Sequence, residues 1–117
     1  MDLRHLEVGH IETRLEVELD AEAMRGRLGF KTGIRPNHWL PGREYTFVGK
    51  LDFTDREWLR PGEKCTAVGH LIIAEQDLGS FVPGFTWQIG ESVYIVGRCT
   101  LLSIEGACER LLSSPGG

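Results

Sequence analysis

The basic residues between positions 24 and 43 are the side chains whose chemistry is easiest to interpret. This segment holds five of the 13 basic residues of the chain and none of its 17 acidic ones. Guanidinium groups and the backbone amides of glycines both donate hydrogen bonds to phosphate oxygens. The segment therefore predicts phosphate or RNA contact at Arg25, Gly26, Arg27, Lys31, Arg35 and Arg43. The alternative is that these cations are solvated or paired within the fold.

Two tryptophans are candidates for protein contacts. Trp39 and Trp58 lie in loop-like stretches close to Pro41 and Pro61, whereas Trp87 falls in a strand pattern and is expected in the core. Aromatic side chains on loops often anchor protein interfaces. We therefore predict Trp39 and Trp58 as protein-interface residues, with closure of one end of the fold as the alternative for Trp39.

Neither the cysteines nor the histidines have the spacing of a reactive site. Cys65, Cys99 and Cys108 contain no CxxC pair, so a disulfide framework and a zinc site are not indicated. A thiol-dependent enzyme would need a histidine beside Cys65 or Cys99, but both cysteines fall in strand patterns, where thiols are usually packed apolar groups. The four histidines have no metal-ligand spacing. We predict no metal, no cofactor and no catalytic activity.

Length and composition predict a single domain in the cytoplasm. A chain of 117 residues can bury one core without disulfides. No signal-peptide apolar region and no apolar run of about 18 residues is present, so no membrane segment is expected. The net charge of −4 argues against broad, non-specific nucleic-acid binding. We expect a flexible lead-in over residues 1–9, a folded domain over 10–105 and a C-terminal tail over 106–117.

The pattern of apolar residues predicts strands and almost no helix. Strict alternation over residues 10–20 indicates a half-buried strand. Further strands are expected over 44–53, 65–74, 85–89 and 93–104, with residues 71–73 buried on both faces. We expect a turn at 39–42, a short helical turn within 54–60, a loop over 75–83 and a hairpin turn at 90–92. Gly49, Gly69 and Gly97 interrupt strand patterns and are interpreted as bulges or corners. Five or six strands at this spacing predict a closed antiparallel barrel.

Four short motifs resemble the C-terminal β-barrel domain of bacterial translation elongation factor Tu. They are Phe-x-Thr-Gly-x-Arg-Pro at residues 30–36, a Pro-Gly-acidic turn at 60–63, the run at 84–91 and the Val-Gly ending at 95–99. The motifs follow the order of the family at nearly its spacing, and the resemblance covers roughly residues 10–105. The resemblance implies an all-β, six-stranded antiparallel closed barrel, in which residues 32–36 hold a strand in place. It also implies contact with aminoacyl-tRNA, a GTPase domain and a nucleotide exchange factor.

The resemblance has specific departures. Arg25, Gly26 and Arg27 occupy the places of a tRNA-facing Gly-Arg-His segment without its histidine. The family has a tRNA-facing Lys-Pro pair where this chain has residues near Ala74 and Glu75. Its Gly-Gly hairpin is replaced here by Ser92 and Val93. No GxxxxGK[ST] phosphate loop occurs, so GTP hydrolysis is not carried over. We expect a non-catalytic binding module for RNA, tRNA-like RNA or a protein of the translation machinery. The alternative is a protein-interaction or self-association module with no nucleic-acid role, and a small thiol-dependent enzyme is the third hypothesis.

Overall fold

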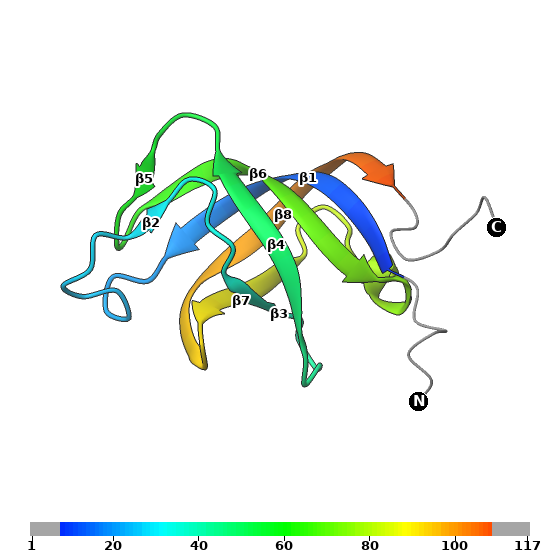
Figure 1. Ribbon diagram of the computed structural model, residues 1–117, viewed down its shortest axis with the longest axis horizontal. Helices are drawn as coiled ribbons and strands as arrows, with labels where there is room; N and C mark the ends of the chain where they lie inside the picture. Colours follow the sequence, from blue (N-terminus) through cyan, green and yellow to red (C-terminus); the bar gives the residue numbers. More distant parts are fainter. Residues whose placement is uncertain (1–7, 109–117) are drawn as a thin grey trace.

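The chain folds into one closed six-stranded antiparallel barrel (Figure 1). The computed structural model describes residues 8–108. The strands follow one another around the barrel in the order β1-β6-β4-β3-β7-β8. Their bounds are β1 Val8–Leu19, β3 Asn37–Trp39, β4 Thr46–Phe53, β6 Lys64–Ala74, β7 Thr86–Glu91 and β8 Tyr94–Cys108. The predicted all-β barrel is therefore confirmed.

Strand β1 has the two faces that its sequence predicts. Its alternate residues from Ile11 to Leu19, including Thr13, are buried, whereas Glu12, Arg14 and Glu16 are exposed. β1 pairs with β6 on one side and with β8 on the other. Its acidic side chains consequently lie on the outside of the barrel, where water solvates them.

The barrel interior is filled by aliphatic side chains around an aromatic cluster. Phe47, Phe81, Phe85 and Trp87 contact one another with ring centroids 5.3 to 6.0 Å apart. Tilted and edge-on arrangements of this kind are the favoured ones for aromatic pairs. The prediction that Trp87 belongs to the core is confirmed, because its side chain is buried.

The Thr-Gly-x-Arg-Pro motif joins the segment before β3 to strand β4. The amide of Gly33 donates to the carbonyl of Leu51 at 2.7 Å, and the amide of Leu51 donates to Ile34 at 2.9 Å. The hydroxyl of Thr32 accepts from the amide of Phe53 at 2.8 Å. Gly33 has a φ of +88°, a conformation that glycine adopts without strain. This part of the motif has the expected structural role.

Two glycines within strands, Gly49 and Gly69, let neighbouring side chains pack against the backbone. A Cβ at Gly49 would lie 2.6 Å from His38 Nε2, and one at Gly69 would lie 2.5 Å from Leu15 Cδ1. The strand register is regular at both positions, so neither glycine marks a bulge, and the interpretation of both as corners stays a prediction. Gly97 does lie beside a bulge, since Gly97 faces Ile89 and Ile95 faces Gly90 across β7 and β8.

Several predicted connections differ from the structure. The helical turn expected within 54–60 is wrong: strand β5, Trp58–Leu59, lies there and pairs with β2, Phe30–Lys31. The loop expected at 75–83 contains the 3-10 helix η2, Glu75–Ser80. Residues 71–73 are not buried on both faces, because Ile72 lies on the outside of the regular β6 alternation.

The boundaries of the last hairpin and of the domain also shift. The hairpin turn falls at Ser92 and Val93 instead of 90–92. β8 continues through Cys108, so the first three residues of the expected tail are strand. The rest of that tail, and residues 1–7 of the lead-in, lie outside the described residues. Within residues 8–108, no helix is long and apolar enough to cross a bilayer.

Candidate binding face

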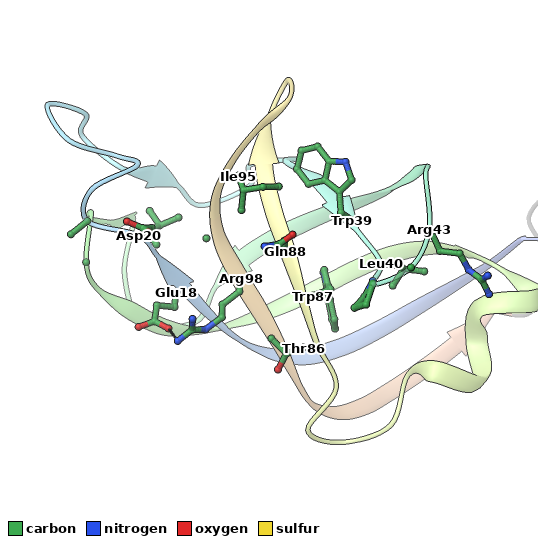
Figure 2. Close-up of a pocket in the computed structure, with 16 residues that line it drawn as sticks. Glu18, Asp20, Trp39, Leu40, Arg43, Thr86, Trp87, Gln88, Ile95 and Arg98 are labelled. Carbon is green, nitrogen blue, oxygen red and sulfur yellow. Dashed lines mark ion pairs between the residues drawn. The ribbon is translucent and has the colours of Figure 1, made fainter.

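A groove of about 790 Å³ runs over the outer surface of strands β3, β7, β8 and β1 (Figure 2). Its floor contains one row of directly paired residues, in which Trp39 faces Gln88, Gln88 faces Arg98, and Arg98 faces Glu18. Outward-pointing residues that are paired in neighbouring strands lie side by side. Closure of the barrel therefore assembles this row from β1, β3 and the β7–β8 hairpin, three parts of the chain that are distant in the sequence.

Trp39 lies at one side of the groove, and it lies in a strand. The prediction that Trp39 occupies a loop is wrong, because β3 includes it and pairs it with Thr46 and Gln88. A Cβ at Gly90 would lie 2.7 Å from Trp39 Cζ3. The glycine at position 90 thus lets the indole lie against β7, where it borders the groove and is only partly exposed.

The charged groups around the groove have partners within the chain. Glu18 forms an ion pair with Arg98, and Arg43 Nε lies 3.0 Å from Asp77 Oδ1. Asp20 Oδ1 accepts hydrogen bonds from the amides of Glu22 and Ala23. The groove consequently presents an aromatic ring, aliphatic surface, two ion pairs and the Asp20 carboxylate, without an excess of positive charge.

The β7–β8 hairpin forms an apolar projection beside this groove. Val93 is 79% exposed and Tyr94 is 71% exposed, and Ile95 of the same hairpin lines the groove. We call Val93, Tyr94 and Ile95 the hairpin tip. Leu28, 72% exposed, lies in the loop that follows β1. The hairpin tip was predicted as strand and not as a candidate site, although two consecutive large side chains after a turn are a visible signal in the sequence.

Two polar contacts hold the hairpin tip. Arg27 Nη2 lies 2.8 Å from Glu91 Oε1, which ties the loop after β1 to the end of β7. Asn37 Nδ2 donates to the carbonyl of Ser92 at 2.9 Å. Ser92 has a φ of +53°, in the left-handed region that suits the turn. The hairpin tip is thus fixed to the barrel from two sides.

Most of the predicted basic residues are paired with carboxylates within the chain. The pairs are Arg25 with Glu22, Arg27 with Glu91, Lys31 with Glu57 and Arg43 with Asp77. Arg35 is exposed and, within residues 8–108, has no carboxylate within 4.0 Å. Gly26 lies in the turn after β1 with a φ of +76°. The geometry thus matches the intramolecular alternative for four of the five cations.

The remaining candidates lie apart from the groove or inside the barrel. Trp58 is partly exposed in β5, opposite Lys31 of β2. Burial raises the pKa of the Cys65 thiol to about 11 and raises the pKa of the enclosed Cys99 still further. The thiolate is the nucleophilic form, so neither side chain is activated for catalysis. His10 and His70 stack at 5.9 Å on the outer surface, and no group within residues 8–108 has the geometry of a metal site.

His38 is a buried polar residue that sequence analysis did not single out. Trp87 Nε1 donates to His38 Nδ1 at 2.9 Å, and His38 Nε2 lies 3.0 Å from the carbonyl of Gly49. These contacts fix the neutral tautomer that carries its proton on Nε2. Burial lowers the pKa of His38 from 6.5 to about 4. His38 therefore serves the core as a neutral link between β3, β4 and β7.

No protein-family model matches this chain, and no curated protein matches it.

Proposed function

We propose that this chain is a non-catalytic β-barrel module of the elongation factor Tu C-terminal type, and that it binds a protein partner through the hairpin tip and the adjoining groove. The single observation that carries the proposal is the exposure of Val93 and Tyr94 on a hairpin that is held in place. Burying one valine-sized side chain contributes about 1.5–3 kcal/mol. Two such side chains next to Trp39 form the kind of apolar centre on which protein interfaces depend.

The contacts behind the hairpin tip favour binding because they reduce its entropic cost. A loop that is ordered only on binding loses conformational freedom, and that loss weakens association. Here the Arg27–Glu91 pair and the Asn37–Ser92 hydrogen bond already order the hairpin. A partner therefore meets a surface whose shape is set in advance.

A protein partner is better supported than RNA. Phosphate groups would have to replace carboxylates at Arg25, Arg27, Lys31 and Arg43, and one of those carboxylates, Asp77, is buried. The groove has no surplus of positive charge to attract a polyanion. The sequence resemblance supports a partner among the proteins of the translation machinery, and the composition of the chain supports a place in the cytoplasm.

The proposal is tested by comparing the wild-type chain with Val93→Arg and with the control Val82→Arg. Val82 is also an exposed valine, 56% accessible, but it lies in the connection between η2 and β7 at the other end of β7. We expect a protein to be retained from cell extract by wild type and by the control, but not by Val93→Arg. In a calorimetric titration, the purified protein should bind wild type and Val82→Arg directly and should not bind Val93→Arg.

The RNA alternative is measured in parallel by filter binding with tRNA. Retention at low salt that is lost in the Arg25→Glu, Arg35→Glu double variant would favour RNA over protein. This pair leaves Arg27 and its contact with Glu91 intact. A Val93→Arg chain that binds every partner as wild type does would overturn the proposed function.

A further inference from the structure

Strand β8 extends beyond the strand that pairs with it on one side. β7 accompanies β8 only as far as Thr100, and the amide of Leu101 then donates to the carbonyl of Phe85 at 2.8 Å. On its other side, β8 pairs with β1 through Cys108. In the part of the chain that the structure describes, no backbone hydrogen bond forms on the β7 side of β8 beyond Leu101. Residues 102–108 are therefore an open sheet edge beside β1 (Figure 1).

The open edge keeps the regular spacing of a strand in spite of two bulges. Residues along an antiparallel strand bond alternately to the neighbours on its two sides. Leu101, opposite Leu15 of β1, bonds on the β7 side. The next equivalent positions of β8 are Ile104 and Ala107, because they face every second residue of β1 from there on, and the bulges absorb the extra residues. The amides and carbonyls of Ile104 and Ala107 consequently point away from β1 at the interval at which a regular strand would meet them.

The apolar packing of the barrel is incomplete at the same place. Ile104 lies opposite Thr13, whose side chain is fully buried. Directly paired residues project from the same face of a sheet, yet Ile104 is 46% exposed. Leu102, the extra residue of the first bulge, is 43% exposed. A strand added beside Ile104 would bond its free backbone groups and cover its side chain together.

The chemistry of an open edge specifies what can cover it. A row of alternating amide donors and carbonyl acceptors is complemented by another backbone in an extended conformation, whereas a helix uses its backbone groups internally. We infer that the edge of β8 at Ile104 and Ala107 binds an extended segment of a partner polypeptide, which adds a strand to the sheet and places an apolar side chain beside Ile104. The edge lies at the opposite end of β8 from the hairpin tip, so this binding is additional to the proposed function.

Amide hydrogen exchange of the full chain, followed by nuclear magnetic resonance, tests whether the edge is open. We expect the amides of Ile104 and Ala107 to exchange at least about a hundredfold faster than the bonded amide of Leu101. Slow exchange at both positions in the dilute monomer would show that another part of the chain covers the edge, and would overturn the inference. Protection that appears only as the protein concentration rises would assign the edge to a second copy and overturn it likewise.

A short synthetic peptide in which valine and threonine alternate between two terminal lysines is the binding probe, because these residues favour the extended conformation. At saturation it should slow exchange of the Ile104 and Ala107 amides at least about tenfold. The same peptide with proline at its centre is the control and should have no effect, since proline has no amide to donate. An equal response to the two peptides, or no response to either, would overturn the inference.

Variants of the edge show whether the peptide binds there. Ile104→Pro removes an amide that does not bond to β1, and Ile104→Lys adds a charge of the kind that protects natural sheet edges. Each should raise the dissociation constant of the peptide at least about tenfold. Val48→Lys is the matched control, because Val48 is 55% exposed on a strand that has neighbours on both sides.

Circular dichroism of each variant establishes that the barrel is intact. Unchanged affinity in the folded Ile104 variants overturns the inference. Val93→Arg should bind the peptide as wild type does, so that failure of strand addition and failure of the proposed function are distinguished.

Discussion

Acidification should destabilise the barrel through His38. In the folded chain this side chain is buried, and its pKa is lowered to about 4 from an ordinary value of 6.5. In the unfolded chain the imidazole takes up a proton below pH 6.5, whereas in the barrel it stays neutral until about pH 4. The stabilisation is therefore fully present above pH 6.5 and is lost as the pH falls towards the folded value.

The size of the effect follows from the two pKa values. Each pKa unit corresponds to about 1.36 kcal/mol, so the complete loss is about 3 kcal/mol. Between pH 7.5 and pH 5, where the protonation of carboxylates contributes less, the expected loss is about 2 kcal/mol. That is a large share of the free energy of unfolding of a small domain, which is typically about 5–15 kcal/mol.

Urea denaturation at a series of pH values measures this loss. His38→Gln retains an amide donor and an acceptor for Gly49 and Trp87 but does not titrate, so its free energy of unfolding should change about 2 kcal/mol less than that of wild type over the same interval. His10→Gln, at a partly exposed position on the outer surface, is the control and should behave as wild type. Other titrating groups are common to the variants and cancel in the comparison.

Nuclear magnetic resonance of the wild-type ring provides a second test that does not depend on the variant folding. The His38 resonances should keep their neutral chemical shifts down to pH 5, with the proton on Nε2. A His38 titration midpoint above pH 6 would refute the reasoning. An unchanged pH dependence in folded His38→Gln would refute it as well.

Two substitutions and one measurement of chemical reactivity test the packing of the barrel. Asp77→Asn should lower the free energy of unfolding by about 2 kcal/mol, because the buried carboxylate binds Arg43 and accepts a hydrogen bond from the Tyr45 hydroxyl. Urea denaturation of Asp77→Asn, Arg43→Gln and the double variant should show a coupling energy of about 1 kcal/mol, and strictly additive losses would contradict the contact. Gly49→Ala should lower the free energy of unfolding by about 1–3 kcal/mol, because the added Cβ would lie 2.6 Å from neighbouring side chains. Gly79→Ala is the control and should leave the stability nearly unchanged, because its Cβ has no neighbour within 4 Å. Equal shifts of the unfolding temperature in the two variants would contradict this explanation. Cys99 should react with iodoacetamide at least about a hundredfold more slowly in the folded chain than in urea, as measured by mass spectrometry of its peptide, and comparable rates would show that it is not enclosed.

The barrel could be predicted from the pattern of apolar residues along the chain. The period-two pattern of β1 assigned Leu15 and Val17 to the interior and Glu16 to the exterior, because side chains alternate between the two faces of a strand. Turn residues located most of the remaining strands. Short elements such as β3 and β5 escaped prediction because two or three residues carry too little periodicity to be recognised.

Which side chains contact one another could not be predicted before the fold was known. The segment of residues 24–43 contains no acid, so its cations looked available for phosphate. The fold brings Glu91 to Arg27 and Asp77 to Arg43 from 64 and 34 residues away. In the same way, the row from Trp39 to Glu18 exists because strand pairing around a closed barrel sets β1, β3 and the β7–β8 hairpin side by side. Strand periodicity is local and can be read along the chain, whereas charge pairing and the groove depend on contacts that form only when the barrel closes.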